Sequence, residues 1–398
     1  MKKAENKRVR YIFFISLFIV MSFIFLCVGH FLFGISKDTV QKPAESTLQP
    51  DSFENTAALE ISPVKYIHRS ETINGVKQEI NILEIDPGAS GVQIQPVLSH
   101  DLIYGFEKLS EMVSRKKAYA AVNSGFFYEY GLPAGMVVID GELISGSTGR
   151  YPVFVVEKGK ALFKEIESKL TVEYWSSGEI KENSADSIKV DILNFPAGEN
   201  ETAVYTPVYG RFNRAEKKNI SVTVENGVVT KIAFYNSEAE IPKNGMLISL
   251  FDTERYAGVE IPLKVGDAVK LSHQPVMGEN ADAYECGSWL VREGKPVVAL
   301  KDAWVGIMTN RDPRTAICIR EDGTVILLTV DGRQPGYSAG FTGRELAEYL
   351  ISCDVKDAAM LDGGASTEML VEGKLVSRPS FKGEERPLAG GILVLLDK

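Results

Sequence analysis

The stretch Ala358–Glu368, with the sequence AAMLDGGASTE, constrains the fold more than any other part of the chain. Its apolar start predicts a buried strand. Asp362-Gly363-Gly364 must end that strand, because glycine admits positive φ and lets backbone N–H groups come close to a ligand. Ser366, Thr367 and Glu368 then add polar side chains just beyond the turn. An ordinary Asp-Gly turn is the alternative interpretation.

Other Asp-Gly pairs in the chain are of the ordinary kind. Asp140-Gly141 and Asp322-Gly323 each stand between two apolar stretches, as hairpin turns do. Asp331-Gly332 and Asp362-Gly363 differ, because the small and polar residues after them cannot begin the second arm of a hairpin. These two pairs therefore indicate polar loops at strand ends, where a ligand site can form.

The composition is that of an ordinary globular protein, with 44% hydrophobic and 24% charged residues in 398. A net charge of −9 argues against a nucleic-acid binder, whose affinity comes mainly from a basic surface. The four histidines have no metal-ligand spacing and lie far in sequence from the polar loops, which argues against a His-rich zinc site and a Ser-His-Asp triad. The four cysteines form no disulfide pattern.

An almost wholly apolar run covers residues 11–35. At about 1.5 Å per residue this run is long enough to cross a bilayer. We expect an uncleaved transmembrane anchor, with a cleaved signal peptide as the alternative. The basic residues of 1–10 predict a cytoplasmic tail, and hence a single-pass protein of the cell membrane whose C-terminal domain is extracytoplasmic. Residues 36–60 are polar and are predicted to be a disordered linker.

Residues 61–398 are predicted to form one α+β domain of mixed and antiparallel sheets with packed helices. Helical spacing predicts a helix within 104–116, and a capping box at Thr342–Glu345 predicts another. The order helix, strand, polar loop and hairpin occurs twice, first around Asn123 and then around Asp362. This suggests a duplicated unit whose two loops face one cleft, although shared hairpin patterns alone can produce the same order.

Four polar loops carry the side chains that are capable of chemistry. They are Asn123–Phe127, Asn310–Thr315, Asp331–Gln334 and Asp362–Glu368. Arginine suits phosphate, because its planar guanidinium makes bidentate, charge-assisted hydrogen bonds. Two carboxylates suit glycoside cleavage, in which one protonates the leaving oxygen and the other activates water or attacks the anomeric carbon. The combination fits a sugar joined through phosphate.

Three motifs follow one another as in the phosphodiester glycosidases: PRTAI at 313–317, VDGRQ at 330–334 with GYS at 336–338, and LDGGAS at 361–366. The chain resembles this family, which includes N-acetylglucosamine-1-phosphodiester α-N-acetylglucosaminidase and many bacterial members, over most of residues 61–398. It departs from the family pattern at Ser124 and Ala365, where glycine is usual, and at Glu368, which adds a carboxylate.

The resemblance implies an extracytoplasmic hydrolase that cleaves an N-acetylglucosamine-1-phosphodiester-like bond in envelope or exopolysaccharide glycans. Asp362 would be the acid/base or the nucleophile, with Asp331 or Glu368 as its partner. The expected substrate-binding residues are Asn123, Arg314, Thr315, Arg333, Gly363, Gly364, Ser366 and Thr367. For each arginine, a structural ion pair is the alternative.

Two other functions remain open at this point. The chain could bind glycan phosphate without turnover, or it could be a metal-dependent phosphodiesterase whose carboxylates hold a hard cation. We expect no metal site and no required cofactor, with a structural divalent cation as the alternative. The expected partners are a sugar-phosphate glycan and, through the N-terminal helix, the membrane. No nucleic acid and no obligate protein partner are expected.

Overall fold

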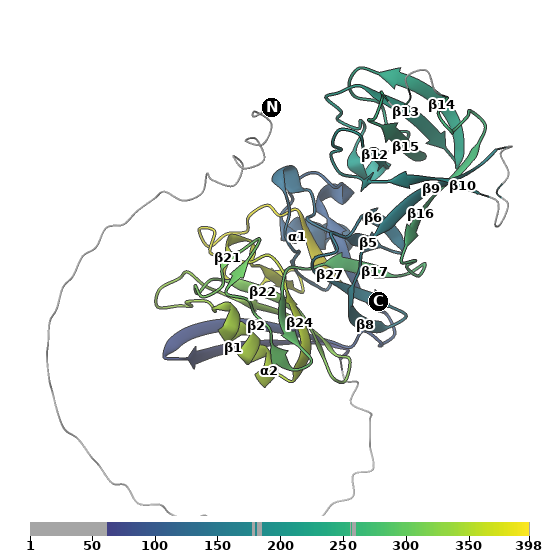
Figure 1. The fold of residues 1–398 in the computed structure, drawn as a ribbon. Helices are drawn as coiled ribbons and strands as arrows, with labels where there is room; N and C mark the ends of the chain where they lie inside the picture. The colour runs from purple at the N-terminus through teal and green to yellow at the C-terminus, as the bar shows by residue number, and fades with distance from the viewer. Residues whose placement is uncertain (1–61, 177–179, 181–184, 255, 257–259, 398) are drawn as a thin grey trace, which may run out of the picture. The chain divides into compact units, whose positions relative to one another are not determined.

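Strands dominate the computed structural model, which describes residues 62–397 except 177–179, 181–184, 255 and 257–259 (Figure 1). The α-helices of these residues are α1 (Leu109–Lys116) and α2 (Gly343–Ser352). The predicted α+β class with packed helices is therefore wrong, and the protein is mostly β. Both helices lie where capping and periodicity predicted helix, but they are short, and strands account for nearly all the other regular structure.

The predicted location is corrected as well. No helix in the described part of the chain is long and apolar enough to cross a membrane. The predicted tail at 1–10, anchor at 11–35 and linker at 36–60 lie outside the described residues. Because nothing in the described structure supports a single-pass membrane protein, that prediction is not retained.

The candidate site lies at one end of the central strands of a seven-stranded sheet. Its strands are, in order across the sheet, β1 (Val64–Ile73), β2 (Val76–Ile85), β23 (Val325–Val330), β22 (Arg314–Arg320), β24 (Val355–Met360), β18 (Trp289–Arg292) and β19 (Lys295–Pro296). The central strands are apolar and buried along almost their whole length, as expected for strands covered on both faces. Helix α2 packs on this sheet, with Leu346 and Leu350 in one cluster with Leu328 and Ala358.

A five-stranded sheet joins three distant parts of the sequence. Its order is β26 (Lys374–Leu375), β25 (Met369–Val371), β4 (Ala120–Asn123), β27 (Gly390–Leu396) and β3 (Val92–Leu98). Met369 pairs with Val122, and Gly391 pairs with Asn123. The end of β4 is thereby fixed between two C-terminal strands.

The remaining strands form three further sheets. An eight-stranded sheet has the order β10 (Asp186–Val190), β9 (Lys169–Trp175), β16 (Ala268–Gln274), β14 (Val228–Tyr235), β13 (Asn219–Glu225), β15 (Gly245–Leu250), β12 (Thr202–Tyr205) and β11 (Ile192–Leu193). A five-stranded sheet has the order β6 (Glu142–Ser145), β5 (Val137–Ile139), β17 (Asp282–Glu285), β7 (Pro152–Glu157) and β8 (Lys160–Glu165), and β20 (Lys301–Asp302) pairs with β21 (Gly306–Ile307).

The local turn predictions are confirmed. Asp140-Gly141 joins β5 to β6 with both residues at positive φ, as a tight hairpin turn requires. Asp322-Gly323 joins β22 to β23. The capping box of α2 is present, since Glu345 N donates to Thr342 Oγ1 and Thr342 N donates to the Glu345 carboxylate.

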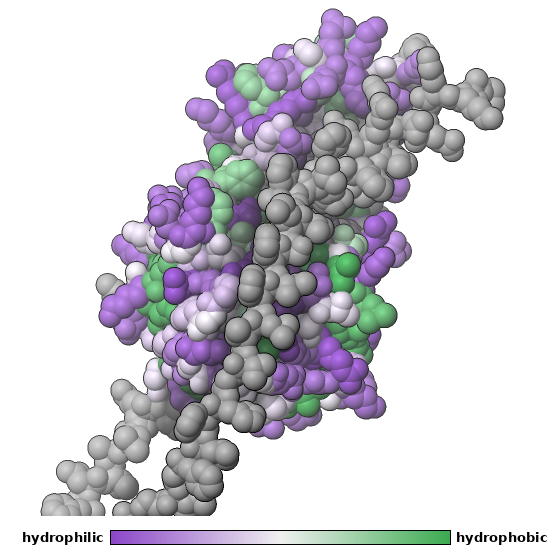
Figure 2. Space-filling model, turned by 90° about the vertical axis from the view of Figure 1, so that its left-hand side faces the viewer, coloured by the Kyte–Doolittle hydropathy of each residue, from purple (hydrophilic) through white to green (hydrophobic). Residues whose placement is uncertain are grey.

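The surface is mixed rather than dominated by one apolar face. On the side drawn in Figure 2, hydrophilic residues predominate and the hydrophobic patches are separated from one another. The large hydrophobic residues exposed on the described chain include several aromatic side chains, among them Phe106, Tyr128, Tyr130 and Phe234. Two of these aromatic residues line a cavity that is described below.

Candidate active site at one edge of the seven-stranded sheet

Three predicted loops meet at one edge of the seven-stranded sheet because neighbouring strands run antiparallel. Strand β22 begins at Arg314, opposite Val330 at the end of β23, and Ala316 pairs with Met360 at the end of β24. Asp331 and Asp362, which follow β23 and β24, therefore come to the same edge. Strand β22 lies between them, which separates their backbones by about 10 Å, or two strand spacings.

Asn123, at the end of β4, fastens the loop of Asp362 in place. Its Nδ2 donates to the carbonyl oxygens of Asp362, at 2.7 Å, and of Ser124, at 3.0 Å. Its Oδ1 accepts from Thr315 Oγ1 at 2.8 Å and from Glu368 N at 3.2 Å. All the hydrogen-bonding positions of this carboxamide are thus occupied by protein. Asn123 and Thr315 are both buried and brace the site, and the Asn123 carboxamide has no group left over for a sugar hydroxyl.

Asp362 is the most accessible carboxylate of the predicted set. It is half-buried, and its Oδ1 accepts from the backbone N–H of Gly363 at 2.9 Å. Burial raises the pKa of this carboxyl, while the Ser366 hydroxyl, the charge of Arg386 and the Gly363 N–H act in the opposite direction. A half-buried carboxyl with a raised pKa is suited to exchange a proton during a reaction.

Glu368 and Thr367 lie behind Asp362 and are almost completely buried. Glu368 Oε1 accepts from Arg386 N at 2.9 Å, whereas Glu368 Oε2 and Thr367 Oγ1 have no hydrogen-bond partner among the described residues. Burial raises the pKa of Glu368 to about 8. Glu368 is therefore protonated at neutral pH, and its unpartnered oxygen marks a position that a water or ligand group can occupy.

Asp331 is also buried, on the far side of β22. Its Oδ2 accepts from the backbone N–H of Arg378 at 2.9 Å and from Tyr337 Oη at 3.2 Å, and its Oδ1 has no partner among the described residues. Burial raises the pKa of Asp331 to about 7. Near pH 7 Glu368 is thus mostly protonated and Asp331 about half protonated, and each has one oxygen without a partner among the described residues.

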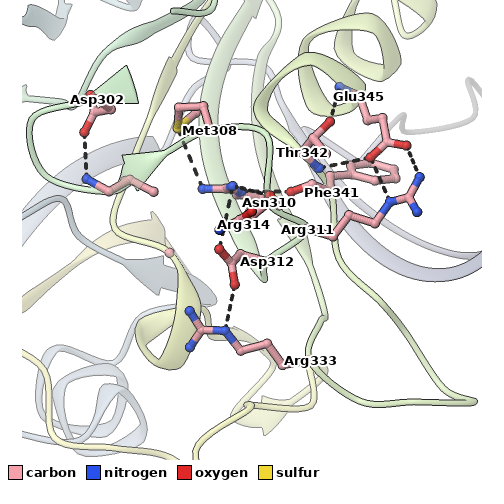
Figure 3. A network of polar contacts seen from close by, with 12 residues as sticks. Asp302, Met308, Asn310, Arg311, Asp312, Arg314, Arg333, Phe341, Thr342 and Glu345 are labelled. Carbon is pink, nitrogen blue, oxygen red and sulfur yellow. Dashed lines mark hydrogen bonds and ion pairs between the residues drawn. The ribbon is translucent and has the colours of Figure 1, made fainter. Parts of the chain in front are cut away.

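The two predicted phosphate-binding arginines occupy opposite environments, with Asp312 between them (Figure 3). Arg314 is 1% exposed, and it donates to the carbonyl oxygens of Phe341 and Asn310, each at 3.0 Å. Burial lowers the pKa of this guanidinium. Arg314 therefore supports the loops on either side of it and cannot reach a ligand in this structure.

Arg333 is available to an anion. Its side chain is 51% exposed, and among the described residues its one side-chain hydrogen bond runs from Nε to Asp312 Oδ1 at 2.8 Å. The terminal nitrogens lie over Gly364, where an added Cβ would be 3.1 Å from Nη2. Gly364 also has a φ of +62°, so both the turn and the approach of Arg333 require glycine.

The two glycines do not offer the N–H groups expected of them. Gly363 N donates to Asp362 Oδ1, and Gly364 N donates to the carbonyl oxygen of Pro313 at 2.9 Å. Their contribution is steric, because a Cβ on Gly363 would lie 2.9 Å from the same Pro313 oxygen. The glycines let the Asp362 loop pack directly against the start of β22.

Arg386 is a site residue that the sequence did not single out. Its positive charge lowers the pKa of both Asp362 and Glu368, and its backbone N–H holds Glu368. The guanidinium is half-buried, 5.9 Å from the Phe127 ring centre. The segment that carries Arg386 has no periodic pattern, and only its Arg-Pro pair, which matches the family, could have drawn attention to it.

No group of three or more His, Cys, Asp or Glu side chains in the described part of the chain is arranged to hold a metal ion. The structure brings together Asp362, Glu368, Ser366, Thr367 and Asn123 in one region. Arg333 and Gly364 form the rim of this region. Asp331 lies on the other side of β22, and Arg314, at the start of β22, is buried.

Comparison with known proteins supports the resemblance seen in the sequence. Residues 218–395 match the family model described as phosphodiester glycosidase. The matched region includes Asp331, Asp362, Glu368 and both arginines, but not β4 with Asn123.

Two curated proteins are similar over part of their length. The SPbeta prophage-derived uncharacterized protein YomE of Bacillus subtilis (strain 168) is 28% identical over 198 residues, which are 47% of this chain and 30% of YomE. The N-acetylglucosamine-1-phosphodiester α-N-acetylglucosaminidase of Bos taurus is 40% identical over 67 residues, which are 17% of this chain and 12% of the bovine enzyme. The chain thus matches less than a third of either relative.

Among solved structures, a hypothetical protein from Synechocystis has the same fold. Its TM-score is 0.69 at 22% sequence identity, and the match covers 84% of this chain and 62% of that one. This likeness concerns the fold alone.

Proposed function

We propose that this protein is a hydrolase of glycan phosphodiesters that cleaves a sugar-1-phosphodiester on the sugar side of the phosphate. The observation that carries the proposal is the position of Asp362, a half-buried carboxyl at a strand end, next to a loop that Arg333 covers with two unused guanidinium nitrogens. The family match of residues 218–395 supports the same class of reaction.

The chemistry follows from the leaving group. In hydrolysis the bond between the anomeric carbon and the phosphate oxygen breaks, its electron pair stays on the phosphate, and water oxygen bonds to the carbon. A phosphate monoester leaves readily and needs little protonation, so the critical group is the base or nucleophile. Asp362 as the carboxylate takes the water proton or attacks the carbon itself. Arg333 holds the phosphate during this step.

Glu368 and Asp331 are the two candidates for the second carboxyl. Glu368 shares Asn123 and Arg386 with Asp362, which favours it as the partner. Both carboxyls are buried, and each has one oxygen without a hydrogen-bond partner among the described residues. We propose that they hold protons close to the reacting groups and that residues 61–398 form the catalytic domain. The proposed substrate is an N-acetylglucosamine-1-phosphodiester-like unit of an envelope or exopolysaccharide glycan.

Burial of Glu368 and Asp331 also supports a second candidate function, a module that binds glycan phosphate without turnover. In that case Arg333 alone would meet the ligand, and Asp362 would only shape the turn. Substitution of Asp362 separates the two functions, because a binding module has no turnover to lose.

The test incubates the full chain with the methyl phosphodiester of α-N-acetylglucosamine 1-phosphate and follows products by ¹H and ³¹P NMR. Free N-acetylglucosamine together with methyl phosphate supports the proposal, and Asp362→Asn should then abolish turnover while ligand affinity is kept. N-acetylglucosamine 1-phosphate and methanol would instead indicate a phosphodiesterase. Saturable binding without any product would favour the binding module. A repeat with a chelator tests for a required cation.

A further inference from the structure

Tyr128 and Phe195 stand between two cavities that the proposed reaction does not use. Both residues line a cavity of about 490 Å³ on one side and a cavity of about 260 Å³ on the other. The larger cavity lies in the size range of sites for small organic ligands. Because the two cavities share these rings, one elongated ligand can occupy both.

The larger cavity is lined mainly by aromatic side chains. Tyr128 meets Phe195 edge to face, with 5.5 Å between the ring centres, and Tyr104 meets Tyr209 in the same way at 5.0 Å. An edge-to-face pair leaves one ring face open, and Tyr128 remains 43% exposed. The rings are fixed, since Tyr128 also packs on Trp304 and the Tyr104 hydroxyl donates to that of Tyr209 at 2.9 Å.

Arg214 is one of four charged residues that line this cavity, with Glu129, Glu216 and Lys217. Its guanidinium carbon lies 3.9 Å from the ring centre of Tyr104, a stacked position that fixes the plane of its donors. No described residue accepts a hydrogen bond from Arg214 or forms an ion pair with it. A planar donor group held against an aromatic ring, without a partner of its own, is suited to bind ligand oxygens.

Hydroxyl side chains line part of the smaller cavity, beside apolar residues such as Leu170, Val190 and Leu193. Ser145 Oγ donates to the carbonyl oxygen of Gly135 at 2.6 Å, Ser147 Oγ donates to that of Ile166 at 2.5 Å, and Thr148 Oγ1 donates to Glu285. A hydroxyl whose proton is used can still accept through its lone pairs. This cavity therefore offers oriented acceptors to the hydroxyl groups of a ligand.

We propose that the two cavities are adjacent subsites for consecutive sugar units of a glycan chain. A pyranose ring has an apolar C–H face and a rim of hydroxyls. The aromatic rings of the larger cavity suit the C–H face, and the hydroxyl oxygens of the smaller cavity suit the sugar hydroxyls. The shared Tyr128 and Phe195 would lie under the linkage between the units. This inference goes beyond the proposed function because it assigns a site for the polymer, whether or not the chain is turned over.

The sugar-binding surface is connected to the candidate active site through the segment that follows Asn123. Phe126 stacks on Trp304 with 5.5 Å between the ring centres, and Trp304 contacts Tyr128. Phe126 also packs against Gly287, whose N–H donates to the carbonyl oxygen of Met360 at the end of β24. A glycan held by Tyr128 is thus connected through these contacts to the end of β24, two residues before Asp362.

The test measures binding of three tetrasaccharides to the full chain by isothermal titration and ligand-observed NMR. These are cellotetraose, chitotetraose and the hyaluronan tetrasaccharide, which represent neutral, N-acetylated and carboxylated sugars. At least one should bind with a dissociation constant of about 1 mM or tighter. Tyr128→Ala and Phe195→Ala should each weaken that binding at least tenfold. Phe234→Ala is the control, since Phe234 is 54% exposed and lies on β14, outside both cavities.

The exposed Arg214 provides a variant that leaves the aromatic packing intact. Arg214→Gln should weaken binding of the preferred tetrasaccharide, most strongly if it is the carboxylated one, and thermal unfolding checks that each variant is folded. The proposal is overturned if the unmodified chain binds none of the three, or if the Arg214 and Phe195 variants bind as tightly as the unmodified chain. Binding of adenosine together with no binding of any of the three tetrasaccharides would also overturn the proposal. Each of these results is independent of hydrolysis.

Discussion

The side-chain amide of Asn123 donates a 2.7 Å hydrogen bond to the backbone carbonyl of Asp362, 239 residues away in sequence. Through the same carboxamide, Thr315 and Glu368 are joined to this pair. A residue expected to bind sugar is thus the point at which three segments of the site, β4, the start of β22 and the 362–368 loop, are held in register. The position of Asp362 depends on this hydrogen-bonding group.

Asn123→Ala should lower the free energy of unfolding by about 2–4 kcal/mol, because it leaves buried polar groups of Asp362, Thr315 and Glu368 without a partner. Urea unfolding measures this. Asn244→Ala, at an exposed position, should change stability by less than about 0.5 kcal/mol. Equal stability of the two variants would show that the Asn123 network contributes little.

Glu368→Gln should change how stability depends on pH. The pKa of Glu368 rises from 4.5 to about 8 on folding, so the folded state binds the extra proton between these values. The contribution of the Glu368 carboxyl to the free energy of unfolding is fully present below about pH 4.5. It is lost as the pH rises towards 8, by up to about 1.4 kcal/mol per pH unit. The variant should therefore gain stability relative to the unmodified chain between pH 5 and 8.

Urea unfolding at pH 5, 6.5 and 8 measures this difference. Glu384→Gln, at an exposed position, is the matched control and should follow the unmodified chain at every pH. A difference between Glu368→Gln and the unmodified chain that stays constant from pH 5 to 8 would mean that Glu368 is already ionised in the folded protein.

Substitutions of the two arginines on either side of Asp312 should have opposite effects: one on the stability of the fold and the other on ligand binding. Arg314→Met should destabilise the fold by about 2–4 kcal/mol, since the carbonyl oxygens of Phe341 and Asn310 lose their buried donor. Arg333→Gln should cost less than about 1 kcal/mol, because its ion pair is exposed. Only Arg333→Gln should weaken binding of a phosphodiester in a folded protein. Thermal unfolding and titration calorimetry distinguish these effects, and unchanged affinity in Arg333→Gln would remove that residue from the site.

Arg386→Gln should raise the pKa of both Asp362 and Glu368 further, because the positive charge of Arg386 stabilises both carboxylates. Lys108→Gln should affect Glu368 alone. The carboxyl ¹³C signals of labelled protein, followed against pH, report each group separately. The control is Lys382→Gln, an exposed change in the same segment as Arg386. Titration of Asp362 that is the same in Arg386→Gln as in the unmodified chain would contradict the assignment.

The sequence predicted the features that depend on neighbouring residues. The strand before Asp362, the α2 capping box and the Asp140-Gly141 hairpin are local, and each lies where its pattern indicates. The predicted fold class was wrong because the two helices could be recognised from the sequence, whereas most of the short strands could not. Short strands of two to four residues carry almost no periodic pattern, and many of the strands here are of that length.

Features that depend on distant residues could not be predicted. Arg314 begins a strand buried on both faces, so alternation along the strand does not reveal that its guanidinium points into the protein. The partners of Asn123 come from β22 and from the Asp362 loop, which no local pattern connects with β4. The four polar segments lie at strand ends, as the sequence indicated, whereas which of their side chains are buried and which are exposed required the three-dimensional arrangement.

The pairing of β4 between β25 and β27 has a consequence for synthesis of the chain. Asn123 leaves the ribosome early, but its neighbours in the sheet are made last, so the site around Asp362 cannot assemble until β27, ending at Leu396, has emerged. A fragment limited to the family-matched residues 218–395 would also lack β4. Such a fragment would contain the candidate carboxyls without the strand that aligns them.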